Sequence, residues 1–143
     1  NPPATVFGQG TGLAVNGDTM IAYCFHGVEG YSKFGTYTGN ESATAGPFAY
    51  TGFRPAFLMV KNTDASGNWV IFDNKRTPNN SFTTKSALYA DLNNAESADT
   101  TLRADFLANG FVMYSGSNSF NNDGNTYIYM AFAETPFKYA TAR

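Results

Sequence analysis

The sequence is poor in cysteine, histidine and charged side chains. Its 143 residues include one cysteine and one histidine, and charged residues make up 14% of the chain, against roughly 25% in ordinary soluble domains. A single cysteine excludes a disulfide within the chain and makes a cysteine-based metal site unexpected. Cys24 lies in an apolar run, so we expect it to be a small core residue.

The sequence also has no long apolar run and no basic cluster. A membrane-spanning helix needs roughly 20 apolar residues in succession, so no membrane insertion is expected. The formal net charge is −2, and nucleic-acid binding requires clustered Lys and Arg to neutralise phosphates, so nucleic acid is not expected as a partner.

Catalytic and metal-binding patterns are missing as well. A glycan-cleaving site requires two carboxylates about 5–10 Å apart, whereas the acidic residues are scattered and mostly lie in turns, where they are expected to cap the backbone. His26 has no nucleophile motif beside it. The clusters at 91–96 and 121–124 offer oxygen ligands of the kind calcium uses, but neither has a metal-loop spacing. We therefore expect no enzyme, no metal and no cofactor.

Aromatic residues are abundant, with 13 Phe, 9 Tyr and an aromatic content of 16%. With so few charges, the surface must be covered by Ser, Thr, Asn, Gly and Tyr. This composition is more typical of extracellular or virion β-proteins than of cytosolic enzymes. It is also what an oligomer that hides much of its surface would have.

Residues 51–73 predict a hairpin around which the chain is organised. Pro55 suits the first residue of a strand, because its backbone is fixed and it lacks a donor for the ladder. An apolar run, a turn and a second apolar run follow at 56–60, 64–68 and 69–72. The first run is apolar at both odd and even positions, and such a strand is covered on both sides. The hairpin is therefore expected at the centre of a packed sheet.

Other short segments rich in aromatic and β-branched residues are bounded by turn residues. They are expected as strands at 19–26, 33–38, 48–53, 86–92, 111–115 and 125–134. Residues 101–108 are expected to form one or two helical turns, with Thr101 as the cap and Gly110 beyond the end. Residues 74–85 are expected to be a loop. About eight short strands predict an all-β, antiparallel, jelly-roll-like β-sandwich with little helix.

Residues 17–25 and 124–132 resemble each other without a gap, sharing Gly, Thr, Ile and Phe at equivalent positions. The first copy is either the closing strand of a preceding, similar domain or a core strand that is similar by chance. We expect residues 1–16 to be a linker or the end of a preceding domain, and 17–143 to be one β-sandwich domain. Because the sequence opens with Asn1 and not methionine, we expect a piece of a longer tandem protein.

Several motifs follow one another in a familiar order. They are Val28-Glu-Gly-Tyr-Ser-Lys-Phe-Gly-Thr-Tyr-Thr-Gly-Asn40, Tyr50-Thr-Gly-Phe-Arg-Pro-Ala-Phe-Leu-Met-Val-Lys61, Trp69 with Asp73, Asn109-Gly-Phe111 and Gly124-Asn-Thr-Tyr-Ile-Tyr-Met-Ala-Phe132. This ordered set resembles a module of tail-fibre and related virion proteins of tailed bacteriophages, often found beside concanavalin-A-like lectin domains. The resemblance implies a β-sandwich in an extended, usually trimeric, extracellular appendage of the virion. It carries over no functional residues.

Glycan binding is the recognition chemistry that the residues suggest. Sugar sites usually combine an exposed aromatic side chain with polar side chains that bond the hydroxyl groups. The candidate ligand-binding residues are Trp69, Asp73, Asn74 and Arg76, with Tyr31 and Tyr37 as further aromatic candidates. The alternative for Trp69 is a position in the core or at a trimer interface.

The resulting hypothesis is a structural and receptor-recognition domain of a phage tail fibre. It would form a homotrimer, contact other virion proteins and bind host cell-surface polysaccharide. One alternative is a structural or decoration module that binds no ligand. Another is a polysaccharide-degrading accessory or esterase domain, against which the absence of an acid pair or nucleophile argues.

Overall fold

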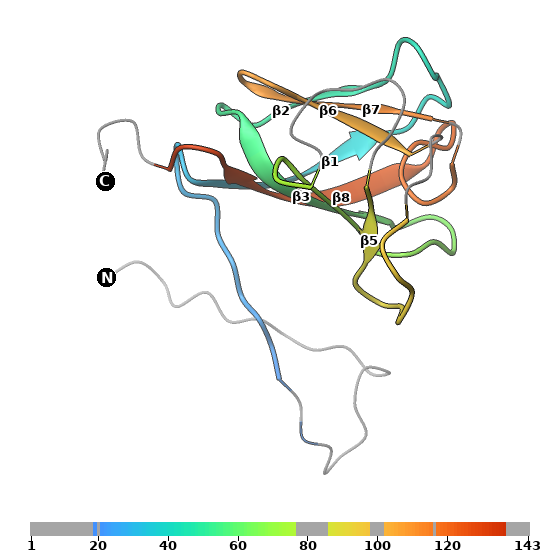
Figure 1. Ribbon diagram of the computed structural model, residues 1–143, viewed down its shortest axis with the longest axis horizontal. Coiled ribbons are helices and arrows are strands. Elements are labelled where there is room, and N and C mark those ends of the chain that lie inside the picture. Colours follow the sequence, from blue (N-terminus) through green and yellow to red (C-terminus); the bar gives the residue numbers. More distant parts are fainter. Residues whose placement is uncertain (1–18, 20, 77–85, 98–101, 116, 137–143) are drawn as a thin grey trace.

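The computed structural model describes residues 19, 21–76, 86–97, 102–115 and 117–136, which form an antiparallel β-sandwich without a helix (Figure 1). One sheet has five strands in the order β1-β8-β3-β4-β5, and the other has three in the order β2-β7-β6. The strands are β1 (Ser32–Thr38), β2 (Phe48–Tyr50), β3 (Pro55–Asn62), β4 (Val70–Asp73), β5 (Leu88–Tyr89), β6 (Arg103–Leu107), β7 (Gly110–Tyr114) and β8 (Thr126–Ala133). Within these residues no helix is long and apolar enough to cross a membrane.

The expected central hairpin is confirmed. Strands β3 and β4 pair antiparallel, and β3 lies in the middle of the five-stranded sheet between β8 and β4. Its even-numbered residues Leu58 and Val60 are fully buried against the second sheet, whereas Phe57 and Met59 are only partly covered. The single chain therefore covers one face of this strand, as expected, but leaves the other face partly exposed.

The helix expected at 101–108 is wrong. Residues 103–107 form β6, which pairs antiparallel with β7 through a two-residue turn at Ala108 and Asn109. Ala104 and Phe106 both point into the core, which is the alternation of side chains typical of a strand. The Asn-Gly pair that follows lies at a hairpin turn and not at the end of a helix. Thr101, the expected cap, lies outside the described residues, as does most of the loop expected at 74–85.

The strand expected at 19–26 is also wrong in the described part. Residues 19 and 21–26 form no strand and are exposed, and Cys24, expected in the core, is exposed with them. A strand requires a neighbour to accept and donate its backbone hydrogen bonds, and this segment leads away from the sandwich (Figure 1). The described residues of the first copy of the repeat therefore form no strand, whereas the second copy forms most of β8, which lies between β1 and β3.

An aromatic cluster fills one end of the core. Tyr37 stacks on Tyr127 with ring centroids 5.0 Å apart, and the edge of Phe111 meets both Tyr37 and Tyr129. The hydroxyl of Tyr37 donates a hydrogen bond of 2.5 Å to the carbonyl oxygen of Phe120. The polar end of this buried ring is thereby satisfied, and the β7–β8 connection is fixed over the core.

Candidate functional site

A row of apolar side chains crosses the outer face of the five-stranded sheet. The cross-strand pairs place five residues side by side, one on each strand: Phe34 on β1, Met130 on β8, Met59 on β3, Ile71 on β4 and Leu88 on β5. Directly opposed residues point to the same side of a sheet. Each of the five is partly exposed, because no second layer of the described chain covers this side. We call this surface the outer apolar face.

Further aromatic side chains extend the outer apolar face at its β1–β8 end. Phe132 meets the ring edges of three neighbours at centroid distances of 5.8 to 6.1 Å: Tyr31, Phe34 and Phe57. Such edge-on contacts stabilise aromatic clusters beyond simple burial. Tyr31, expected as a possible sugar-binding residue, is therefore part of this cluster.

A hollow of about 320 Å³ lies in the outer apolar face. It is lined by Phe34, Gly35, Thr36, Met59, Trp69, Ile128, Tyr129 and Met130. Trp69 thus lies among methionine, isoleucine and phenylalanine, and no charged residue lines the hollow with it. Only Thr36 and Tyr129 bring hydroxyl groups to this lining, which is otherwise apolar, so the hollow suits an apolar side chain better than a glycan.

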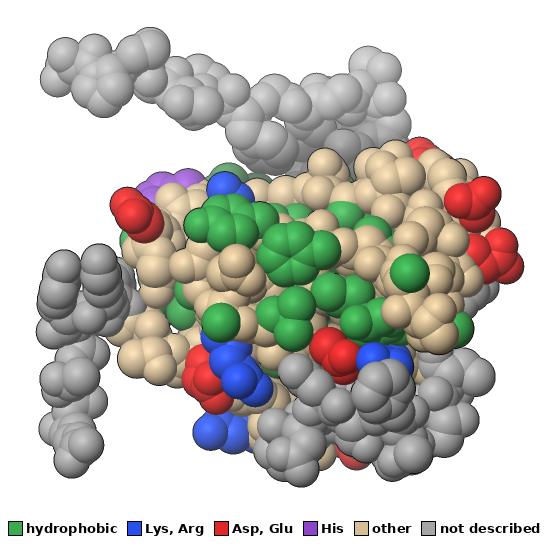
Figure 2. Space-filling view, turned by 90° about the horizontal axis from the view of Figure 1, so that it is seen from above, with side chains coloured by type: hydrophobic (Ala, Val, Ile, Leu, Met, Phe, Trp, Pro, Cys, Tyr) green, Lys and Arg blue, Asp and Glu red, His purple; other side chains and the backbone are tan. Residues whose placement is uncertain are grey.

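The outer side of the three-stranded sheet carries a separate apolar group. Figure 2 shows apolar side chains in the middle of this face, with charged side chains mainly toward its margin. Phe48 and Tyr50 of β2 and Leu107 of β6 are 48%, 63% and 37% exposed. This second surface provides a matched comparison for tests of the outer apolar face.

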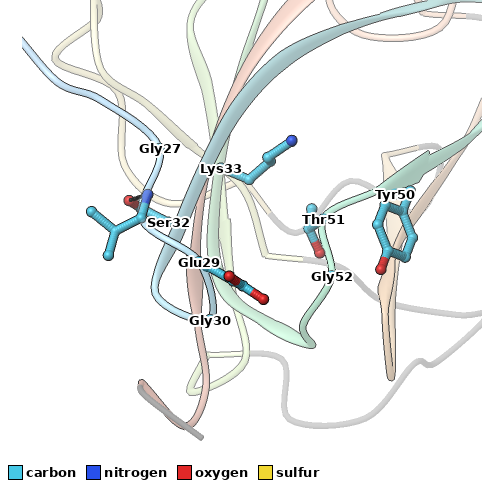
Figure 3. Close-up of a pocket in the computed structure, with 9 residues that line it drawn as sticks. Gly27, Glu29, Gly30, Ser32, Lys33, Tyr50, Thr51 and Gly52 are labelled. Carbon is cyan, nitrogen blue, oxygen red and sulfur yellow. Dashed lines mark hydrogen bonds between the residues drawn. The ribbon is translucent and has the colours of Figure 1, made fainter.

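A polar cleft of about 350 Å³ lies between the start of β1 and the β2–β3 connection. Figure 3 shows Glu29 and Lys33 on one side and Tyr50 and Thr51 on the other. Glu29, Lys33 and Tyr50 are exposed, whereas the Thr51 hydroxyl donates to the carbonyl oxygen of Phe53 at 2.5 Å. The cleft therefore offers an aromatic ring, a cation and a carboxylate at its rim. Sequence reasoning missed it because Glu29 and Lys33 lie far from Tyr50 along the chain.

The expected sugar-binding residues on β4 do not form one site. Trp69 precedes the strand and Asp73 ends it, and Trp69 lines the apolar hollow. Asp73 accepts hydrogen bonds from the backbone N–H groups of Lys75 and Arg76 and from the Arg76 guanidinium. Partial burial acts to raise the pKa of the Asp73 carboxyl, but these hydrogen bonds together lower it below its ordinary value. Asp73 and Arg76 are therefore engaged in closing the turn.

Two other residues expected to bind sugar are buried and make hydrogen bonds within the fold. Tyr37 is 8% exposed in the core, so its ring cannot reach a surface ligand, and the expectation that it contacts sugar is corrected. Asn74 is 7% exposed and donates to the Glu134 carboxylate at 2.7 Å. Its side-chain oxygen is buried and has no hydrogen-bond partner among the residues that the structure describes.

Acidic side chains in turns bond the backbone. Asp91 accepts from the N–H of Trp69 at 3.0 Å, and Asp64 accepts from the N–H of Thr126. The Thr126 N–H is the main reason that the pKa of Asp64 lies below its ordinary value. Within the described ranges, no three His, Cys, Asp or Glu side chains gather where they could hold a metal ion.

The chain belongs to the domain family DUF7483, described as a domain of unknown function, whose model matches residues 1–136. No curated protein and no solved structure matches the chain.

Proposed function

We propose that this member of the DUF7483 family is an assembly module of a bacteriophage tail fibre, which forms a homotrimer and helps to present the fibre to the host surface. The observation that carries this proposal is the apolar row from Phe34 to Leu88 across all five strands of one sheet. Monomeric proteins rarely leave contiguous apolar patches of more than a few hundred Å² in water. An apolar face of this kind is typical of a surface that binds another protein chain.

The place of the module in a virion is supported by the ordered motifs of the sequence and by the fold. The motifs resemble a tail-fibre module, and the β-sandwich is the fold which that resemblance implies. The sparse charge, 14% of residues, also suits a chain that buries surface against other chains, because interface cores are depleted of charged side chains. The module would act outside the cell, among other virion proteins.

The first test is the mass of the purified chain in solution, measured by light scattering across a concentration series. We expect three times the chain mass of 15.5 kDa, with dissociation only on strong dilution. Electron microscopy of the parent particle should then locate the module in a fibre. A chain that stays monomeric at about 100 μM, far above the Kd of a stable assembly, would contradict the proposal.

Glycan recognition is the second candidate function, and the polar cleft favours it. The exposed Tyr50 ring could lie against the C–H face of a sugar, while Lys33 and Glu29 could bond its hydroxyl or carboxylate groups. Host polysaccharides present many copies of one unit, so weak sites on a trimer would act together.

A glycan array followed by titration calorimetry tests the cleft. Tyr50→Ala and Lys33→Ala should each weaken binding of a selected glycan by about tenfold or more. Lys75→Ala is the control, because Lys75 is exposed and lies outside the cleft. Unchanged binding in the Tyr50 variant, or no glycan bound at all, would leave the assembly role without a recognition role.

A further inference from the structure

We propose that the three chains of the assembly exchange N-terminal arms, so that Ile21 and Tyr23 of one chain enter the hollow in the outer apolar face of the next. This inference rests on the proposed homotrimer and names the segment that covers the face. We use "arm" for residues 21–26, which precede the turn into β1.

The arm carries apolar side chains at alternate positions. Ile21, Tyr23 and Phe25 are 76%, 80% and 58% exposed. Alternate residues of an extended segment point to the same side. The arm therefore presents one apolar edge, and the gapless repeat aligns these residues with Ile128, Met130 and Phe132 on the outward side of β8. Exposure of such side chains to water costs free energy, so an arm with this pattern is suited to bind an apolar surface.

The root of the arm is fixed to its own chain. Val28 and Ser32 exchange backbone hydrogen bonds of 3.0 and 2.9 Å, and the Ser32 hydroxyl donates to the His26 carbonyl oxygen at 3.3 Å. Phe25 stacks on Phe34 at 5.7 Å, at the edge of the outer apolar face. Beyond Phe25 the arm leaves the sandwich (Figure 1). Phe25 thus anchors the arm, while Tyr23 and Ile21 extend away from the body that carries them.

The hollow that would bind the arm is present on every copy of the chain. The hollow of about 320 Å³ is lined by Met59, Trp69, Ile128 and Met130 among others, and its lining is almost entirely apolar. A tyrosine and an isoleucine placed there would leave water together with the side chains around them. The hollow is thus chemically matched to the exposed tip of the arm.

Exchange between copies follows from the symmetry that a trimer requires. A contact between identical patches generates a two-fold dimer, whereas a ring of three needs a donor surface and a different acceptor surface on each chain. The arm and the outer apolar face are such a pair. The family match over residues 1–136 spans both the arm and the five-stranded sheet.

Site-directed cross-linking of the full chain tests the exchange. In a Cys24→Ser background, Tyr23→Cys is combined with Ile128→Cys, and a short bismaleimide is added to the native protein. We expect covalent species of two and three chains on a denaturing gel. Tyr23→Cys with Ala108→Cys is the matched control, because Ala108 is an exposed turn residue of the other sheet. The single variant Tyr23→Cys reports links between two arms.

The proposal is overturned if the link forms within one chain, if no link forms, or if either control yields as much multimer as the test pair. A second measurement separates this inference from the proposed function. Replacing Ile21 and Tyr23 with serine should weaken the trimer about a hundredfold or more in light scattering. A serine variant that remains as firmly trimeric as the original chain would refute arm exchange and leave the assembly role standing. An original chain that is monomeric would refute both.

Discussion

Met130→Asp is expected to convert the proposed trimer into folded monomers. Met130 lies within the outer apolar face, opposite Phe34 on one side and Met59 on the other. A carboxylate buried in an interface without a partner costs several kcal/mol, because it loses its hydration. The cost recurs in each of three subunits, so the dissociation constant should rise at least about a thousandfold. Light scattering at matched concentrations measures the change.

The variant should still fold, because Met130 is partly exposed in the single chain and the new side chain can reach water there. Circular dichroism of the dissociated protein checks this point. Phe48→Asp is the control, since Phe48 is 48% exposed on the opposite sheet. If Phe48→Asp dissociates the trimer and Met130→Asp does not, the second apolar surface is the interface.

The sequence predicted much of the sheet because the strongest signals are local. Pro55, the apolar run after it and the turn residues before Trp69 mark a hairpin whatever surrounds them. The apolar character of both faces of 56–60 also carried correct information. One face is covered by the second sheet, and the other is the outer apolar face. The single chain covers only one of the two apolar faces of this strand, and the proposed assembly would cover the other.

The errors have a common physical cause: in segments with a weak local preference, contacts with neighbouring strands determine the secondary structure. Residues 103–107 became a strand because β7 offered a ladder, and the arm formed no strand in its described part because no neighbouring strand pairs with it. The sequence could not show which candidate ligand residues lie together, for a similar reason. Trp69 and Asp73 are close in sequence but lie at opposite ends of β4, whereas Lys33 and Tyr50, distant in sequence, line one cleft.

A steep loss of stability above about pH 10 is expected from the tyrosines of the core. Burial, together with the neighbouring Tyr127 phenol, raises the pKa of Tyr37 well above its ordinary value of 10.0. Burial also raises the pKa of Tyr127, against the opposing effect of the Asn122 N–H, and the pKa of Tyr129. All three phenols are therefore held neutral in the fold at a pH where they ionise in the unfolded chain.

The sign of the effect follows from proton binding. Above about pH 10 the unfolded state releases these protons while the folded state keeps them, so the free energy of unfolding falls as pH rises. Each tyrosine contributes a slope of at most about 1.4 kcal/mol per pH unit, reached only where the unfolded chain is fully ionised and the folded chain fully protonated. Below that range the stabilisation is fully present, so little change is expected between about pH 8 and 9.

Urea unfolding at a series of pH values, followed by near-ultraviolet absorbance of the phenolate, measures this slope. Tyr37→Phe keeps the ring against Tyr127 but removes the hydrogen bond to the Phe120 carbonyl oxygen. The variant should lose about 1–3 kcal/mol at neutral pH, because that buried acceptor loses its donor. It should also show a shallower decline above about pH 10, because one titrating group has gone. A folded protein whose phenols all ionise near pH 10 without loss of stability would refute the buried aromatic cluster as the source of the effect.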